Sequence, residues 1–225
     1  MDENKIKWVL ISVLVLIASV AIHEFGHAMM ADLLGDDTPR RQGRVTLNPI
    51  AHADPIGTLL LPLIGGLYVA SGGIAGGFGW GRPVEWLPSR VKRKWSMATA
   101  TILVAIAGPS MNVLLALVVA GIHGILWTQN ILPHGSELND VLFFTVYTNF
   151  ILFFFNLVPV PPLDGGHVAQ QLLPYRQRGA FDHYAKFGPF IVMALVLIPQ
   201  IAQIFRIPAG FCFEHLYSLF GIHFS

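Results

Sequence analysis

The chain has 225 residues, of which 54% are hydrophobic and only 12% are charged, and its formal net charge is +1. Soluble domains carry about a quarter charged residues, so this balance excludes an ordinary soluble protein and indicates one that crosses a membrane several times. The absence of a basic excess or a basic arm excludes a nucleic-acid partner, and the single cysteine, Cys212, excludes an internal disulfide.

Four segments have the length and apolar character of membrane-spanning helices, each of which needs about 20 mostly apolar residues. The first segment is too long for the apolar region of a signal peptide and lacks a convincing cleavage site, so we interpret it as a retained membrane helix. The four predicted spans cover about residues 6–33, 97–128, 140–158 and 187–205.

A fifth apolar stretch, residues 57–80, is long enough to span but has an unsuitable composition. It contains Pro62 and seven glycines between Gly57 and Gly77, and both residue types weaken a regular helix. We expect it to bend back and line a cavity, because irregular backbone at membrane depth needs protein or water around it. The aromatic tail, residues 210–224, is predicted to form a short interfacial helix.

The distribution of lysine and arginine predicts which loops face the cytoplasm. Segment 34–56 contains three arginines, and segments 82–94 and 174–186 contain both arginine and lysine. Segment 129–140 contains neither residue type. The positive-inside rule places the first three segments in the cytoplasm and the fourth outside. The N-terminus then lies outside, although Lys5 and Lys7 argue mildly against this orientation. The glycine-rich stretch then enters and leaves the membrane on one side.

The first predicted span contains the sequence HEFGH, which places His23, Glu24 and His27 in an apolar segment. Histidines four residues apart project from nearly the same face of a helix and can bind one metal ion. The glutamate lies about 100° around the helix axis, beside the metal, where it can take a proton from a bound water. The alternative is a pair of core histidines with a glutamate in a polar pocket, but ionisable residues inside a membrane usually serve function.

A catalytic zinc site needs a third protein ligand, and Asp164 is the best candidate. It is the only carboxylate between Asp140 and Asp182. Three prolines before it prevent a regular helix, and two glycines after it allow a tight turn. The alternative is that Asp164 caps a following helix. At 1.5 Å per helical residue, the first span carries His23 towards the cytoplasmic side and the third carries Asp164 to a similar depth.

The sequences HEFGH, AGPSMN and NLVPVPPLDGG, in this order on apolar segments, resemble the site-2 protease family of intramembrane zinc metalloproteases. The stretch GRVTLNPIAHADPIGT also resembles compact bacterial members, without a PDZ domain, and the match covers about residues 19–170. The resemblance implies that His23, His27 and Asp164 bind one Zn²⁺ per chain and that Glu24 is the general base.

The resemblance also assigns Asn156 to the site, where it helps to hold the substrate backbone or the oxyanion. An amide beside the metal can donate a hydrogen bond to the charge that develops on the attacked carbonyl. The alternative for Asn156 is a hydrogen bond between two helices of the bundle. Asn112, in GPSMN, has weaker support as a site residue, and its neighbours Gly108, Pro109 and Ser110 are expected to permit close helix packing.

Three further polar residues have open roles. His52 and Asp54 either contact the site or give their loop its structure. His167 stands where members of the family commonly have arginine, directly after DGG. We expect this difference to alter a contact around the site and not the zinc, because a fourth protein ligand would close the catalytic position.

These features predict an all-α polytopic membrane protein, a helical transmembrane bundle with a re-entrant glycine-rich segment and with room for a short membrane-associated β-hairpin. We expect a single transmembrane metalloprotease domain over residues 1–225. Its catalytic core covers about residues 6–173, and a C-terminal helix and interfacial tail cover about residues 174–225.

The predicted function is the hydrolysis of peptide bonds within or next to transmembrane segments of membrane proteins, by Glu24-assisted attack of zinc-bound water. The expected location is the cell (inner) membrane, with the lipid bilayer and a membrane-protein substrate as partners and no nucleic acid. The alternative is a membrane metal carrier or sensor that uses the same ligands without hydrolysis. A third hypothesis is an inactive homologue that binds membrane partners. No motif specifies the substrate or the oligomeric state.

Overall fold

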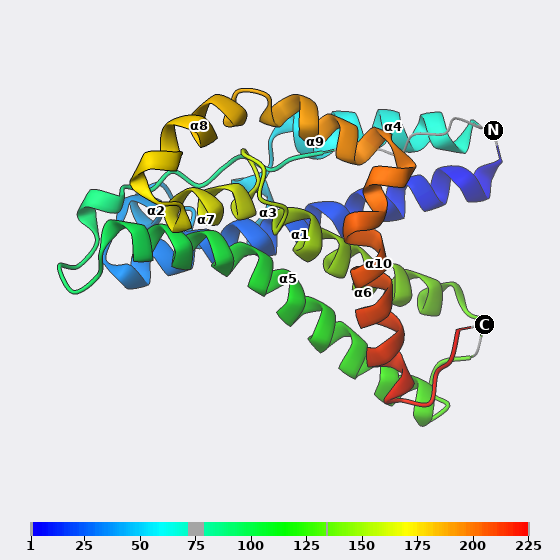
Figure 1. Ribbon diagram of the computed structural model, residues 1–225. Coiled ribbons are helices and arrows are strands. Elements are labelled where there is room, and N and C mark those ends of the chain that lie inside the picture. Colours follow the sequence, from blue (N-terminus) through cyan, green and yellow to red (C-terminus); the bar gives the residue numbers. More distant parts are fainter. Residues whose placement is uncertain (1, 72–78, 134, 225) are drawn as a thin grey trace.

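The computed structural model describes residues 2–71, 79–133 and 135–224, which form helices and connecting loops (Figure 1). The long helices are α1 (Glu3–Leu34), α5 (Met97–Thr128), α6 (Glu137–Asn156) and α10 (Pro199–Ser218). The shorter ones are α2 (Thr38–Arg41), α3 (Pro49–His52), the π-helical turn η1 (Pro55–Leu60), α4 (Leu61–Ala70), the 3₁₀ turn η2 (Pro88–Arg90), α7 (Asp164–Leu172), α8 (Tyr175–Ala185) and α9 (Gly188–Leu197). No β-strand occurs in these ranges, so the β-hairpin that the sequence allowed for is not found in them.

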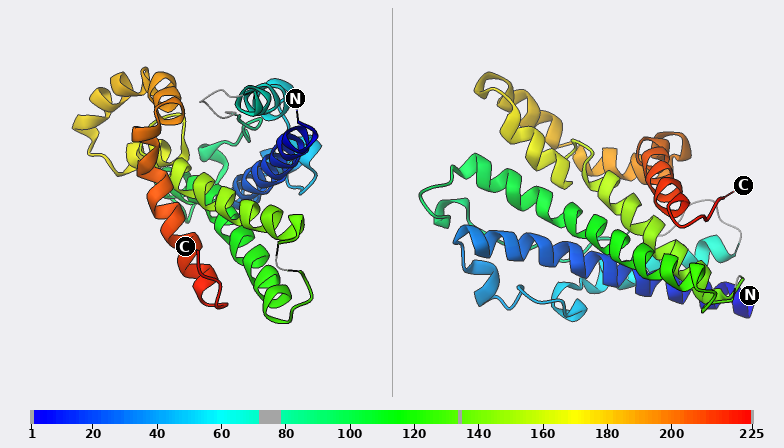
Figure 2. Two further views of the ribbon diagram at one scale, coloured as in Figure 1. Left: turned by 90° about the vertical axis from the view of Figure 1, so that its right-hand side faces the viewer. Right: turned by 90° about the horizontal axis from the view of Figure 1, so that it is seen from below.

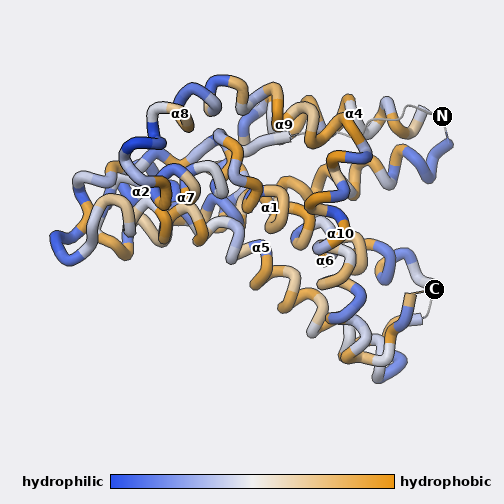
Figure 3. Tube along the Cα trace, in the orientation of Figure 1, coloured by the Kyte–Doolittle hydropathy of each residue, from blue (hydrophilic) through white to orange (hydrophobic). Residues whose placement is uncertain are grey.

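Three helices, α1, α5 and α6, are long and apolar enough to cross a membrane, as the first three predicted spans require. Helix α5 packs against both α1 and α6, and the three lie side by side in both views of Figure 2. Apolar residues dominate these helices, while hydrophilic residues gather around α2 and α8, at the end opposite the N-terminus (Figure 3). The described residues therefore form a helical structure that contains three helices suited to crossing a membrane.

Capping residues define the limits of two of the spans. The Asp2 side chain accepts a hydrogen bond from the backbone N–H of Asn4 at the start of α1, and Ser96 accepts one from Thr99 at the start of α5. At the end of α1, Gly35 adopts a φ of 115°, a left-handed conformation that glycine reaches without strain. The chain thereby turns sharply from α1 into the loop that carries α2.

The fourth predicted span, residues 187–205, is not one helix, and that prediction is wrong. Helix α9 ends at Leu197, Ile198 is extended with φ −100° and ψ 105°, and α10 begins at Pro199. The break has a local cause, because a residue before proline is disfavoured in the helical conformation. Helices α8 and α9, bent by 60° relative to each other, are instead the pair that together resembles a broken span or a re-entrant loop.

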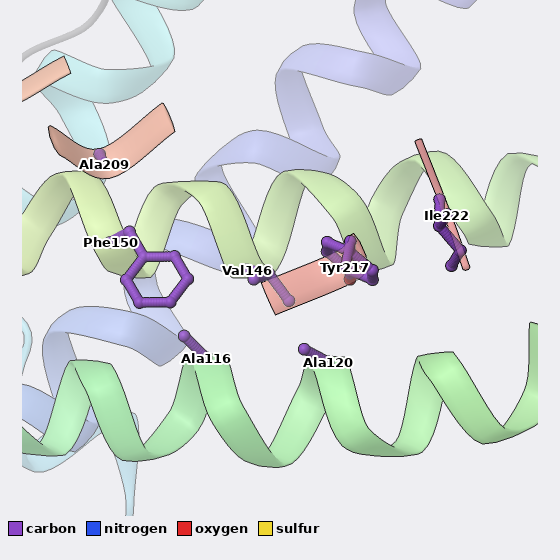
Figure 4. Packing of buried hydrophobic residues seen from close by; sticks show 7 residues of the cluster. All are labelled: Ala116, Ala120, Val146, Phe150, Ala209, Tyr217 and Ile222. Carbon is purple, nitrogen blue, oxygen red and sulfur yellow. The ribbon is translucent and has the colours of Figure 1, made fainter. Parts of the chain in front are cut away.

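The tail, residues 210–224, is not a separate interfacial helix, because its first part is the C-terminal half of α10. Tyr217 is completely buried, and Ile222 is almost so. Figure 4 shows these two side chains beside the contact between α5 and α6, where Ala116 and Ala120 of α5 face α6. The aromatic tail therefore contributes to a hydrophobic core, together with Val146, Phe150 and Ala209.

The two ends of the glycine-rich stretch, residues 57–80, lie together, since the Gly57 carbonyl accepts a hydrogen bond from the Trp80 N–H at 3.0 Å. Between them, α4 runs beside α1 to the level of Lys5, whose ammonium donates to the Ala70 carbonyl at 3.3 Å. Part of the stretch, residues 72–78, lies outside the described residues. Its re-entrant course through a bilayer therefore stays a prediction.

A buried polar cluster joins α5, α6 and α10 at the end remote from α2. His123 is completely buried, with one ring nitrogen 2.9 Å from the Tyr217 hydroxyl and the other 3.1 Å from the Asn139 amide oxygen. Because the Asn139 oxygen only accepts, Nε2 of His123 donates to it, and Nδ1 accepts from the tyrosine O–H. Both ring nitrogens of His123 therefore have a hydrogen-bond partner, as buried polar groups usually do.

Replacing Tyr217 by phenylalanine tests this cluster, because the change leaves Nδ1 of His123 buried without its donor. We expect the free energy of unfolding to fall by about 1–3 kcal/mol. The melting temperature of the purified protein in detergent measures the loss. The matched control is Tyr175→Phe, at a tyrosine that is 87% exposed. Equal melting temperatures for the two variants would show that the buried hydrogen bond contributes nothing.

Candidate metal centre

Helix α1 supplies two of the three side chains that converge at the candidate metal centre. His23 and His27 lie one turn apart in the C-terminal half of α1, and each is only 8% exposed. Their imidazole rings meet edge to face, with centroids 4.7 Å apart. The i, i+4 spacing therefore brings both rings to one side of the helix, as the sequence predicts.

The third side chain, Asp164, is the first residue of α7, and Leu163, in an extended conformation, is the cap before it. Asp164 is thus the first helical residue and not the cap, so the helix-cap alternative is not supported. Two glycines let α7 fold closely against the preceding loop. A Cβ at Gly165 would lie 2.2 Å from the Leu157 carbonyl oxygen, and one at Gly166 would lie 2.4 Å from a backbone nitrogen.

The three side chains approach one another at distances that suit a tetrahedral metal ion. Nε2 of His23 lies 3.2 Å from Oδ2 of Asp164, and Nε2 of His27 lies 3.3 Å from Oδ1. The two Nε2 atoms are 3.0 Å apart. Ligands bonded to zinc at about 2.0–2.2 Å in a tetrahedron are about 3.3–3.6 Å from one another. The set therefore fits one zinc ion with little rearrangement.

The protonation of the imidazoles shows why this cluster needs a cation. Nδ1 of His23 lies 2.7 Å from Oδ1 of Asn112, and Nδ1 of His27 lies 2.7 Å from the Val104 carbonyl oxygen. Both partners only accept, so each Nδ1 donates its hydrogen and each neutral ring leaves a lone pair on Nε2. The two lone pairs and a carboxylate then face one another, a set that a bound cation satisfies.

The carboxylate of Asp164 supports the same conclusion. Its Oδ2 atom is buried without a hydrogen-bond partner. A buried carboxylate oxygen without a donor is expected where a metal ion binds.

Helix α5 approaches the histidines at a glycine. A Cβ at Gly108 would lie 2.3 Å from Nε2 of His27 and 2.9 Å from Nε2 of His23, closer than real Cβ contacts. Gly26 of α1 lies next to the same helix, and a Cβ there would meet the Ala107 carbonyl oxygen at 2.7 Å. Gly108 therefore permits close helix packing, as expected, and it also leaves the space that the imidazoles of His23 and His27 occupy.

A cavity of about 640 Å³ opens at the three side chains. Glu24 lines it beside the histidines, and a Cβ at Gly81 would lie 3.5 Å from Oε1 of Glu24. Asn156 also lines the cavity, and its Nδ2 donates to the Leu152 carbonyl one turn back in α6. Gly79, Trp80, Val84 and Trp86 contribute from the segment before α5, and His167 and Gln171 contribute from α7.

The other residues with open roles fall into two groups. Asp54 caps the turn that begins at Pro55, and His52 lies 2.8 Å from the Thr46 carbonyl, so both give their loop its structure. His167 lines the cavity, but the metal-ligand group found among the described residues consists of His23, His27 and Asp164 without it. That His167 is not a fourth ligand stays a prediction.

The structure gives Asn112 a closer connection to the site than the sequence suggested. Its side chain is completely buried and touches His23, although it does not line the cavity. A signal was present, because Ser19, Asn112 and Asn149 are polar residues within three apolar spans, where polar groups are costly and usually have a role. Their spacing alone does not show that they meet.

Comparison with known proteins identifies relatives of the chain. The model of "Peptidase family M50" matches residues 128–199. "Putative zinc metalloprotease YwhC" of Bacillus subtilis (strain 168) is 34% identical over 195 residues, which cover 83% of this chain and 80% of that protein. "Putative zinc metalloprotease Rip2" of Mycolicibacterium smegmatis (strain ATCC 700084 / mc(2)155) is 33% identical over 190 residues, covering 83% and 66%. Rip2 of Mycobacterium tuberculosis (strain ATCC 25618 / H37Rv) is 29% identical over 218 residues, covering 92% and 71%. No solved structure matches the chain.

The apolar helices and these relatives define a zinc metalloprotease of the membrane. The chain belongs to Peptidase family M50, the site-2 protease family. The resemblance seen in the sequence is thereby confirmed, as are the enzyme class and Zn²⁺ as the cofactor.

Replacing Gly108 by alanine tests the space that the centre needs. We expect the purified variant to hold well under one zinc ion per chain, because the new methyl group would overlap both Nε2 atoms. Alanine favours a helix by about 1 kcal/mol over glycine, so a weaker α5 would not explain the loss. Elemental analysis of the detergent-purified protein measures the zinc. Gly121→Ala, on the same helix with nothing within 4 Å, should keep full occupancy. Equal zinc in both variants would contradict the assignment.

Proposed function

We propose that this protein is an intramembrane zinc endopeptidase that cuts peptide bonds within or next to transmembrane segments of membrane proteins. His23, His27 and Asp164 are the zinc ligands. The observation that carries the proposal is the convergence of these side chains, within 4.8 Å, at the wall of a cavity large enough for a peptide segment. The family of the chain supplies the reaction class.

Glu24 is the general base of the proposed reaction. It follows a ligand histidine on α1 and lines the same cavity, so its carboxylate borders the space where water and the scissile bond meet. Bound zinc supplies Lewis acidity, which makes a water molecule nucleophilic near neutral pH. The Glu24 carboxylate accepts the proton that this water loses and then donates it to the departing amine nitrogen of the cleaved bond.

Asn156 stabilises the negative charge that develops on the attacked carbonyl oxygen. Its Nδ2 carries two hydrogens, and the Leu152 carbonyl accepts one of them. That bond fixes the orientation of the side chain and leaves the second N–H for the substrate. A donor whose position is fixed before the reaction stabilises the transition state without the cost of reorienting during it.

The substrate reaches this site in an unwound form. A transmembrane helix hydrogen-bonds its own amides, so the scissile bond must leave the helix before water can attack it. The glycine-rich stretch that ends at Trp80 borders the cavity and is our candidate for the element that guides the extended segment. We place the enzyme in the cell (inner) membrane with its N-terminus outside, so that water reaches the site from the cytoplasm.

Residues 1–225 form one metalloprotease domain in this proposal, because residues of α1, α5, α6, α7 and α9 line the cavity together. The proposed core ends near residue 173, but Val192 of α9 also lines the cavity. The C-terminal part, residues 174–225, therefore supports the site as well as the bundle.

Replacing Glu24 by glutamine tests the proposed mechanism. We expect the variant to keep one zinc ion per chain but to cleave a helical reporter substrate about 10²–10⁴-fold more slowly, because the amide cannot accept the proton. Cleavage in proteoliposomes and elemental analysis of the same preparation give the two measurements. The control is Glu137→Gln, at the exposed partner of Lys7 near the N-terminal end of α6.

Two outcomes would contradict this mechanism. Full cleavage by the Glu24→Gln variant would remove the general base from the account. Zinc flux across the proteoliposome membrane that is unaffected by Glu24→Gln, without cleavage by the wild-type protein, would favour a metal carrier or sensor.

Replacing Asn156 by alanine tests the oxyanion donor. We expect kcat for the reporter to fall by about 10²–10³-fold while KM and zinc content change little, because the lost hydrogen bond acts chiefly in the transition state. Gln129→Ala, beyond the far end of α5, is the control. A variant that loses substrate affinity with unchanged kcat would instead place Asn156 in substrate binding.

A further inference from the structure

Asn112 lies at the centre of a buried polar network that begins at the metal centre. It is completely buried on α5, at the point where α1 and α6 both approach that helix. Its Oδ1 accepts the Nδ1 hydrogen of His23 at 2.7 Å. Its Nδ2 donates to two oxygens, the Ser19 carbonyl at 3.2 Å and Oδ1 of Asn149 at 2.9 Å.

The network continues on α6 in a way that fixes the direction of every amide in it. Nδ2 of Asn149 donates to the hydroxyl of Ser19 and to the Thr145 carbonyl, both at 2.9 Å. Turning the Asn149 amide over would place its oxygen against that carbonyl, so its Oδ1 must face Asn112. Asn112 must then direct its NH₂ to Asn149, which leaves only its oxygen for His23.

The two histidines are therefore held by different means. His27 donates to the Val104 carbonyl, a backbone group that no side-chain substitution removes. His23 donates to the Asn112 side chain, which replaces the carboxylate, carbonyl or water that usually holds a metal-bound histidine. A ring whose Nδ1 donates in this way presents the lone pair of Nε2 towards Asp164.

We propose that Asn112 is a positioning residue for the metal centre: held by Asn149 and Ser19, it selects the tautomer and the orientation in which His23 binds zinc. The inference rests on the proposed function, since it takes His23 as a zinc ligand. Asn112 touches neither the metal position nor the cavity, and it acts through His23 alone. The asparagine of GPSMN thereby has a specific task beyond helix packing.

Metal affinity of the purified protein in detergent tests the role directly. We expect Asn112→Leu, which removes the acceptor at nearly constant size, to weaken Zn²⁺ binding by about 10–100-fold in competition with a chelator. The d–d absorption of the Co²⁺-loaded variant should shift as well, because the imidazole is no longer held in place. Neither reading depends on peptidase activity.

The matched control is Asn139→Leu. Asn139 is also a buried asparagine whose Oδ1 accepts from a histidine ring, but that ring belongs to His123, away from the centre. Both leucine variants lose a buried hydrogen bond and should melt at lower temperature than the wild type. If Asn112 has only a structural role, the two will weaken Zn²⁺ binding equally. Under our proposal, Asn139→Leu binds as the wild type does.

A conservative variant separates the acceptor from the shape of the side chain. Asn112→Asp keeps an oxygen for the Nδ1 hydrogen of His23, so we expect it to bind Zn²⁺ at least about tenfold more tightly than Asn112→Leu. Equal affinities would overturn the proposal. If either variant does not fold, long-range ¹H–¹⁵N spectra of the zinc-loaded wild-type protein, labelled at histidine, still decide. Hydrogen on Nδ1 of His23 supports the inference, and hydrogen on its Nε2 overturns it.

The same measurements distinguish a failure of His23 as a zinc ligand from a failure of Asn112 as a positioning residue. If the wild-type protein binds no Zn²⁺, or if His23→Ala binds it as tightly as the wild type, the assignment of His23 as a ligand fails. If the wild type binds one Zn²⁺ that His23→Ala weakens, but Asn112→Leu changes neither affinity nor spectrum, only the positioning role fails.

Discussion

Three electron-pair donors held around one buried position impose the constraint on which the other features of this site depend. Nε2 of His23, Nε2 of His27 and the carboxylate of Asp164 lie within 4.8 Å of one another, and Oδ2 of Asp164 has no hydrogen-bond donor. Burying an ionised group without compensation costs several kcal/mol. A cation bound by these three groups would supply that compensation, so the proposed cofactor would also stabilise the bundle.

The surrounding helices meet this constraint with small residues and with fixed acceptors. Gly26 lets α5 approach α1, and Gly108 leaves room at the imidazole nitrogens. The two acceptors for the histidine N–H groups, Asn112 and the Val104 carbonyl, both come from α5. One helix thus sets both the distance and the orientation of the two proposed histidine ligands, while α7 supplies the carboxylate.

The sequence predicts those features that depend on short-range spacing. The convergence of the histidines follows from the helical repeat, and Asp164 stands out because no other carboxylate lies near it in the chain. The limits of the first three spans follow from hydropathy. The break at Ile198 was missed although proline explains it, because apolar composition on both sides suggested a continuous helix.

Other features depend on contacts between distant segments, which spacing does not encode. The aromatic residues of the tail predict an interfacial helix, but Tyr217 forms a buried hydrogen bond with His123, on another helix. Asn112 had weak support because its partners lie on α1 and α6, and only the packed bundle brings them together. The roles of ligand, base and oxyanion donor for particular residues stay proposals, as do the re-entrant course of residues 57–80 and the topology.

The proposed ligands come from the first helix and from a segment late in the chain, which has a consequence for biosynthesis. The two histidines are made before Asp164, so until α7 docks they would form only an incomplete chelate. A protease with these ligands would have no competent centre on the nascent chain, and its activity would begin only when the whole bundle has closed around the metal.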